Sequence, residues 1–225
     1  METRKDGIQD GVEYGKLVTE PRINIRWIDI VSLEETSWNT SETVIVDKYW
    51  NGESADHGRG FRAGLQWSDS ALYVRFDADQ KEPLFINDQP QTSSKTMKLW
   101  EHDVCELFLA PDARNRRRYF EFEIAPTGEW LDLIVDWMKD EPRDWEYESG
   151  METFARIEKD KVTMAMKIPW SAFERRPEAG DVWLGNLFRQ VGSGETRGYL
   201  AWSPTMTQEP QFHVPEKFGE FVFVK

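Results

Sequence analysis

Residues 99–130, LWEHDVCELFLAPDARNRRRYFEFEIAPTGEW, decide the fold. They contain two runs in which apolar residues occupy every second position, joined by the polar segment PDARNRRR. Successive side chains of a β-strand point to opposite faces, so each run has one wholly apolar face. We therefore predict a β-hairpin whose core-facing side chains are Cys105, Leu107, Leu109, Phe120, Phe122 and Ile124.

The opposite face of this hairpin carries glutamates. If the chain turns at the middle of the polar segment, Leu107 lies opposite Phe122 and Glu106 lies opposite Glu123. A slip of two residues would keep the two faces and change only the pairs. Like charges placed across neighbouring strands are destabilising unless something compensates for them. An acidic surface with Trp100 at its entrance suits a ligand rich in hydroxyl groups.

The composition predicts a globular protein with a substantial core. The chain has 225 residues, of which 39% are hydrophobic and 31% charged, and a sandwich of this size need not be divided. A net charge of −13 would repel both nucleic acid and an anionic membrane. The basic run at residues 114–118 lies in the hairpin turn, where a solvated loop is expected. No apolar run reaches the ~20 residues needed to cross a bilayer.

Cysteine and histidine usage argues against the common disulfide and zinc frameworks. The single cysteine, Cys105, allows no internal disulfide, and its place on an apolar face predicts a buried thiol. His57, His102 and His213 are scattered, without the close spacing of a zinc site. The N-terminal segment has no apolar signal region. The protein is therefore cytoplasmic or, if a leader was removed, extracellular or periplasmic.

Apolar residues also alternate in other segments of the chain, and polar segments separate these runs. Residues 80–98 and 203–217 are expected to be long polar loops, and long ordered loops are often functional. We expect a loose N-terminal arm at 1–20 and one all-β domain at 21–225, a single β-sandwich of jelly-roll type with about ten strands. Besides the hairpin, strands are expected at 22–31, 43–46, 61–67, 72–77, 130–136, 154–157, 162–168, 182–191, 199–202 and 218–224.

Several segments occur in a recognisable order: FRAGLQWSDSALYVRFDAD, WEHDVCELFLAP, RYFEFEIAPTGEWLD, WLGNLFRQ and AWSPTMTQEPQFHVPEKFGEFVF. Together they resemble the family 9 carbohydrate-binding modules and their DOMON-like relatives. The resemblance covers residues 61–224 and depends on the order and spacing of the segments rather than on any one of them. It implies a β-sandwich that binds the ends of glucans and small sugars without chemistry. It also implies that structural calcium can be bound, as in several members.

The resemblance also implies site residues. The family's first clamp tryptophan, in a W-x-x-D-x-x-E pattern, falls on Trp100, followed by Asp103 and Glu106. The second clamp aromatic precedes the last P-x-x-F-G and falls on Phe212, beside His213, where binding members have tryptophan. These two aromatic residues are expected to form the walls of a shallow cleft.

The floor of the expected cleft departs from the family pattern. The family's cleft arginine falls on Glu123, and its cleft glutamine falls near Arg189. Because the charges are exchanged between strands, we predict that Arg189 approaches Glu106 or Glu123 on one side of the sheet. The expected ligand-binding residues are Trp100, Glu106, Glu121, Glu123, Arg189, Phe212 and His213.

Each of these residues also has a structural interpretation. Trp100 could cap the core, and the glutamates could be solvated residues on an outer strand face. Phe212 and His213 could anchor a loop. Asp77 and Asp79 have the spacing of calcium ligands, although two carboxylates do not make a site.

Two other functions are compatible with the sequence. Facing glutamates ~5 Å apart would suit a retaining glycoside hydrolase, although an adjacent arginine would hold both acids ionised. Haem binding, known in DOMON-like relatives, would need iron ligands such as Met97, Met164 or His213. We rank non-catalytic saccharide binding first, hydrolysis second and haem binding third. A module of this kind can accompany a glycoside hydrolase, and the sequence names neither the sugar nor the oligomeric state.

Overall fold

Thirteen strands form one continuous sheet in the computed structural model, which describes residues 21–29, 32–34, 38 and 41–225. The strand order is β8-β7-β6-β5-β11-β13-β1-β3-β4-β10-β9, with β12 paired to β11 and β2 paired to β3. The strands are β1 (Arg22–Trp27), β2 (Thr43–Val46), β3 (Phe61–Trp67), β4 (Ala71–Asp79), β5 (Val104–Ala110), β6 (Arg118–Ile124), β7 (Trp130–Asp136), β8 (Arg143–Asp144), β9 (Glu152–Glu158), β10 (Lys161–Pro169), β11 (Val182–Val191), β12 (Gly198–Ala201) and β13 (Gly219–Val224).

The helices are single turns of 3-10 helix in the loops. They are η2 (Leu99–Glu101), η3 (Ala113–Asn115), η4 (Trp170–Ala172), η5 (Gly194–Thr196) and η6 (Pro215–Lys217). No described helix is long and apolar enough to span a membrane.

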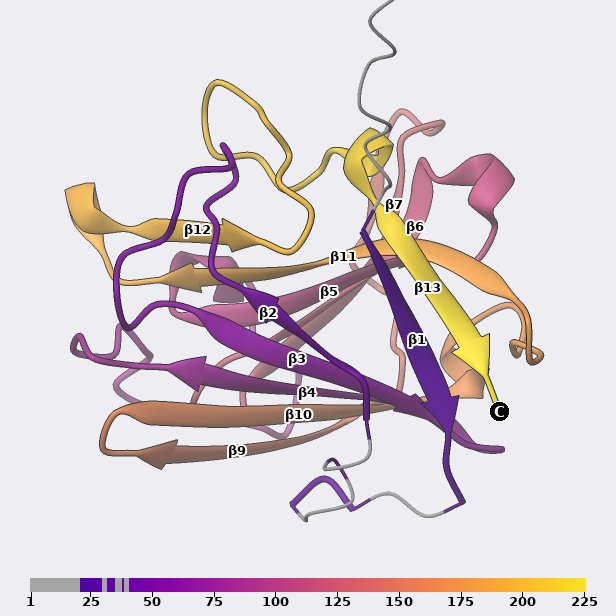
Figure 1. The fold of residues 1–225 in the computed structure, drawn as a ribbon, viewed down its shortest axis with the longest axis horizontal. Coiled ribbons are helices and arrows are strands. Elements are labelled where there is room, and N and C mark those ends of the chain that lie inside the picture. The colour runs from indigo at the N-terminus through magenta and orange to yellow at the C-terminus, as the bar shows by residue number, and fades with distance from the viewer. Residues whose placement is uncertain (1–20, 30–31, 35–37, 39–40) are drawn as a thin grey trace, which may run out of the picture.

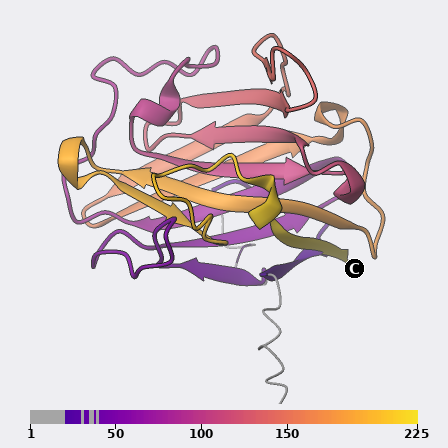
Figure 2. The ribbon, with the colours of Figure 1, turned by 90° about the horizontal axis from the view of Figure 1, so that it is seen from above.

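The sheet curls on itself into two layers (Figures 1 and 2). Strands β2, β3, β4, β10 and β9 lie side by side in one layer, and β7, β6, β5 and β11 form the other. Strands β1 and β13 run in the same direction where the layers meet (Figure 1). The predicted all-β sandwich is therefore confirmed, with more strands than expected. One of them, β8, has two residues, too few to leave a sequence pattern.

The space between the layers is filled by the apolar faces of both. The six hairpin residues predicted to be core-facing are each at most 1% exposed and belong to this cluster. The register also agrees with the prediction, since Leu107 pairs with Phe122 and Glu106 pairs with Glu123. Fully burying a side chain such as Leu107 contributes about 1.5–3 kcal/mol to stability.

A second apolar cluster lies on the other face of the β5–β6–β7–β11 layer, outside the sandwich. It includes Phe108, Tyr119, Phe188, Phe212 and Phe218, which come from three strands and from the loop that precedes β13. The outer face of this layer is therefore partly covered by loops rather than open to water, and it is one part of the fold that can hold a site.

Some predictions lie outside the described residues. The expected N-terminal arm at 1–20 is one of them, and it stays a prediction. The first strand ends at Trp27, and the last two residues of its expected range, 30–31, are also outside the description.

Candidate functional site

A pocket of about 360 Å³ opens on the outer face of the layer that contains β5, β6 and β11. It has an acidic floor, aromatic walls and a rim formed by the loop before β13. Its lining residues are Trp100, Glu106, Phe108, Glu121, Arg143, Trp145, Gln190, Tyr199, Pro210, Gln211, Phe212 and His213. The structure thus brings five of the seven predicted ligand-binding residues to one pocket.

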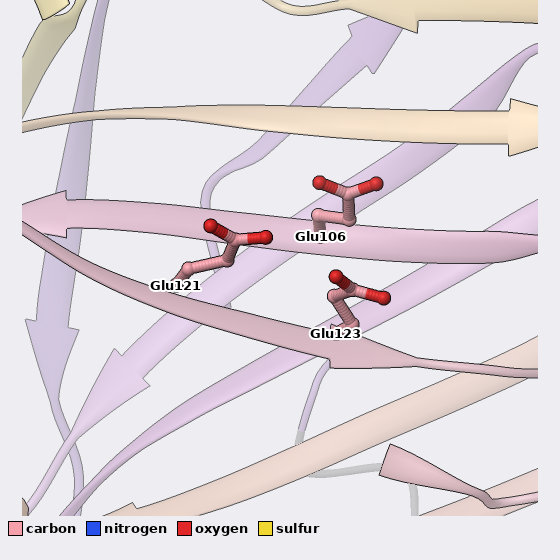
Figure 3. A group of neighbouring side chains, drawn as sticks. All are labelled: Glu106, Glu121 and Glu123. Carbon is pink, nitrogen blue, oxygen red and sulfur yellow. The ribbon is translucent and has the colours of Figure 1, made fainter. Parts of the chain in front are cut away.

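The floor consists of glutamates that the strand alternation turns away from the core. Because Leu107 and Phe122 face the sandwich interior, Glu106, Glu121 and Glu123 face outward. One oxygen of each carboxyl group lies within 4.8 Å of the others, and Figure 3 shows the three groups gathered over the two strands. Their exposed fractions are 2%, 5% and 0%, in the same order. They are therefore not the solvated surface residues of the alternative interpretation.

Burial raises the pKa of all three carboxyl groups. Desolvation, followed by the charge of Glu121, raises the pKa of Glu106 to about 8. Desolvation also raises the pKa of Glu121 to about 7. The pKa of Glu123 lies well above its ordinary value because of desolvation and the two neighbouring acids. Near neutral pH the cluster therefore retains protons and can donate as well as accept hydrogen bonds.

The cluster has few polar partners. Glu106 accepts a hydrogen bond of 2.8 Å from the Gln190 side chain. Apart from a proton shared with Glu121, neither oxygen of Glu123 meets a hydrogen-bond partner among the described residues. A buried acceptor without a donor costs about 1–3 kcal/mol, more if it is charged. The acids therefore destabilise the fold unless another molecule meets them.

One guanidinium ties this floor to the tryptophan wall. Arg197 donates to Gln190 (3.2 Å), which in turn donates to Glu106. Arg197 also donates to the backbone carbonyls of all three residues from Trp100 to His102, at 2.7–2.9 Å. The turn that carries Trp100 is thus fixed relative to the acids.

The aromatic walls come from four segments of the chain. Trp100 packs against Trp145 with ring centroids 6.0 Å apart. Tyr199 meets the edge of Phe212 at 6.1 Å, and Phe212 stacks on Phe188 at 4.1 Å. Phe212 is only 7% exposed and therefore presents little surface to the pocket, whereas Trp100 is half-buried.

His213 is a neutral member of the wall. Trp137 donates to the Tyr119 hydroxyl (3.3 Å), which lies 2.7 Å from His213 Nδ1. Burial, followed by the charge of Arg143, lowers the pKa of His213 to about 4. His213 is therefore a neutral imidazole hydrogen-bonded to the Tyr119 hydroxyl.

Arg189 is not part of this site, and the prediction that it approaches Glu106 or Glu123 is wrong. It pairs with Cys105 and therefore lies on the core-facing side of β11. Its guanidinium donates to the Arg59 and Asp79 carbonyls at 2.6 Å. The residue that faces the acids is Gln190, because a shift of one residue along a strand changes the face.

Seven of the twelve lining residues were not among the predicted ligand-binding residues, and for three of them no local pattern indicates a role in the pocket. Trp145 and Arg143 belong to a segment without alternation, and Tyr199 lies on the short strand β12. Lys95 fixes the Trp145 segment: its ammonium lies 2.6 Å from the Asp132 carboxylate and 3.4 Å from the Trp145 carbonyl.

The structure also places the residues of two weaker alternatives, a calcium pair and a set of haem ligands. Both oxygens of Asp77 are engaged by cationic side chains, with Arg75 at 3.0 Å and Lys161 at 3.1 Å, so the Asp77–Asp79 pair does not fit a calcium ion. Met164 is buried between the layers, whereas His213 lies on the outer face, so these two residues cannot share a haem iron.

The chain was compared with known proteins and structures. Residues 28–225 match the model of the family "Carbohydrate family 9 binding domain-like". A comparison with curated proteins found no match.

Similar solved structures include a candidate carbohydrate-binding protein from Bacteroides uniformis. Its TM-score is 0.70 and its identity 17%, over 90% of this chain and 98% of that one. They also include a family 9 carbohydrate-binding module from Caldicellulosiruptor kristjanssonii. In complex with cellotriose, it has a TM-score of 0.65 and 16% identity over 91% and 94% of the two chains. In complex with glucose, it has the same TM-score and identity over 90% and 95%.

At identities of 16–17%, the TM-scores of 0.65–0.70 show a shared fold. The family match covers most of the chain, including every residue of the pocket. This protein therefore belongs to the carbohydrate family 9 binding domain-like family.

Proposed function

We propose that this protein binds a saccharide without cleaving it, in the pocket between Trp100 and Phe212. The observation that carries the proposal is an aromatic-walled pocket with hydrogen-bonding acids at its floor, on the outer face of the sandwich. Its volume of about 360 Å³ lies within the ~300–1,000 Å³ typical of small-molecule sites. The structural similarity to a module crystallised with cellotriose and with glucose supports the same ligand class.

The lining residues suit the two kinds of surface on a sugar ring. The C–H face of the ring can stack on the half-buried indole of Trp100, while hydroxyl groups meet Glu106, Glu121 and Gln190. Phe212 is smaller than tryptophan and only 7% exposed, so one wall is small. We expect weak binding, with a Kd of ~10–1000 μM.

The electrostatics of the floor favour binding over hydrolysis. A retaining glycosidase needs one neutral acid and one ionised nucleophile, whose environments push their pKa values apart. Here burial raises the pKa of all three glutamates. No described lysine or arginine lies within ion-pair distance of Glu106, Glu121 or Glu123, and the charges of Arg143 and Arg197 offset only part of the rise in the pKa of Glu121 and Glu106.

Calorimetric titration with glucose and cellotriose tests the proposal. The wild type should bind at least one of them, and Trp100→Ala should show no detectable binding. Trp27→Ala is a matched control, because it removes a half-buried tryptophan outside this pocket.

Unchanged binding by Trp100→Ala would overturn the assignment of the pocket. Release of chromophore from aryl glycosides by the wild type, lost in Glu106→Gln, would show hydrolysis instead. If Trp100→Ala unfolds, Trp100→Phe keeps an aromatic wall with a smaller face and should bind several-fold more weakly.

A further inference from the structure

The floor of the pocket carries more acid than hydrogen bonding to neutral hydroxyl groups requires. One carboxylate can accept two or more hydroxyl donors, and Gln190 supplies both donor and acceptor atoms. The structure instead gathers three glutamates within 4.8 Å, none more than 5% exposed. Mutual repulsion and desolvation both oppose this arrangement. A neutral ligand would leave most of the free-energy cost of burying the three acids uncompensated.

Two cationic side chains act on the cluster without pairing with it directly: Arg143 opposes the rise in the pKa of Glu121, and Arg197 opposes that of Glu106. The Arg197 guanidinium is occupied by backbone carbonyls and by Gln190, and it reaches Glu106 only through that glutamine. Arg143 lines the pocket without forming an ion pair with any of the three acids. Glu123 is fully buried, and its oxygens meet no hydrogen-bond partner beyond the proton shared with Glu121. A cation would therefore stabilise the cluster. Glu106 and Glu121 line the pocket, so they are the acids that a ligand can reach.

We infer that the preferred ligand is a saccharide bearing a protonated amino group, which lies at Glu106 and Glu121 while the sugar ring lies between the aromatic walls. This inference rests on the proposed function and specifies its ligand class. An ammonium group offers three donors to the carboxylate oxygens, and an aromatic lining such as that formed by Trp100 favours a cation. Glu123 belongs to the same cluster of acids but does not line the pocket.

The protein already holds one ammonium group in this way. The Lys95 ammonium lies 2.6 Å from the fully buried Asp132 carboxylate and also donates to backbone carbonyls, including that of Asp132 at 3.0 Å. A divalent ion fits the pocket less well. Calcium takes six to eight oxygen ligands, whereas the Oε1 atom of Gln190 already accepts from Arg197. Three carboxyl groups and water would have to supply the whole shell.

The test compares glucosamine, N-acetylglucosamine and glucose by calorimetry at pH 7 in low salt. Glucosamine should bind at least tenfold more tightly than glucose, and N-acetylglucosamine, which carries no charge, should lose that advantage. Glu121→Gln should bring the ratio of glucosamine to glucose affinity close to one. Glu209→Gln is the matched control, because it removes an exposed carboxylate beside the rim residue Pro210 without touching the cluster.

A second readout is proton release. Because the acids are partly protonated at pH 7, amine binding should expel protons, and the heat of binding should change with the ionisation enthalpy of the buffer. If glucose binds and glucosamine binds no better, the inference fails while the proposed function stands. If none of the sugars binds, both fail. If calcium chloride alone raises the melting temperature, with the rise lost in Glu121→Gln, the cluster is a metal site and the inference is overturned.

Discussion

The two faces of the β5–β6 hairpin place similar numbers of buried side chains on the same backbone, with opposite chemistry. On the inner face, Leu107 lies against Phe122 in the sandwich interior. On the outer face, Glu106 lies against Glu123 beneath a pocket. Both pairs are at most 2% exposed. The inner pair stabilises the fold by leaving water, whereas the outer pair destabilises it for the same reason.

This contrast separates what the hairpin does for folding from what it does for function. Buried acids without partners are not needed to specify a sandwich whose core is already complete. Their cost is understandable at a binding site, where strained or unsatisfied groups are expected and a ligand meets them. Substitutions on each face, followed by measurements of stability and of saccharide affinity, can therefore test the difference between the faces.

The largest effect should come from the inner face. Phe122→Ala removes a fully buried ring that contacts Phe120 and Phe173, leaving a cavity between the layers. We expect a loss of about 3–5 kcal/mol in the free energy of unfolding, measured by urea denaturation. A loss below about 1 kcal/mol would show that the inner face is not the main source of stability.

The next effect is a dependence of stability on pH that belongs to the outer face. The pKa of Glu106 rises from 4.5 to about 8 on folding, so between these values the folded state holds more protons than the unfolded state. Stability should therefore fall as pH rises through this range. His213 acts in the opposite sense, because its lowered pKa reduces stability only below its ordinary value of 6.5.

The window from pH 6.5 to 8 therefore reports the glutamates. One such group gives a fall of about 2 kcal/mol across it, since one pH unit corresponds to about 1.4 kcal/mol. Chemical denaturation at several pH values measures this slope, and Glu121→Gln should make it shallower. A wild-type stability that is flat or rising over this window would contradict the raised pKa values.

A smaller effect should appear when the acid least accessible to ligand is removed. Glu123→Met replaces a fully buried carboxyl group by an apolar side chain and relieves its repulsion with Glu106 and Glu121. We expect stabilisation by about 1–2 kcal/mol at pH 8 and little change at pH 5, where all three acids are neutral. Destabilisation at pH 8 would indicate that Glu123 has a structural partner in solution.

The smallest effect concerns the connection between floor and wall. Arg197→Met removes the guanidinium that holds residues 100–102 relative to Gln190. Saccharide affinity should fall about tenfold, or about 1.4 kcal/mol, because Trp100 is no longer fixed over the acids. Lys98→Ala, which removes an exposed charge on the same turn, should leave the affinity unchanged. Equal losses in both variants would argue against the positioning role of Arg197.

The hairpin could be predicted in detail because its pattern is complete. Alternation is unbroken on both strands and the turn is short, so the faces, the core residues and the Glu106–Glu123 pair follow from local sequence. Trp100 could be assigned to the rim because it lies shortly before the first strand of the hairpin, which begins at Val104, and because it matches the family's clamp tryptophan. The number of strands exceeded the expectation, partly because a strand as short as β8 carries no period.

The rest of the pocket depends on tertiary contacts that no local pattern records. Arg143 and Trp145 reach the site through a segment without alternation, one part of which is fixed by Lys95. The error over Arg189 has a simpler origin. Arg189 lies two residues from both Leu187 and Val191, so all three share the interior face of β11. Gln190, one residue away, lies on the pocket side. The sequence was aligned to the family pattern one residue away from Gln190, and this alignment selected Arg189, on the wrong face of β11.

A crystal structure of the protein with bound glucose would test the central claim, that the outer face of the hairpin is a saccharide site. The account predicts a sugar ring against Trp100, with hydroxyl groups within hydrogen-bond distance of Glu106 or Glu121. A well-ordered sugar elsewhere, for example in the cavity beside residues 111–115, with no sugar over the acids, would contradict it.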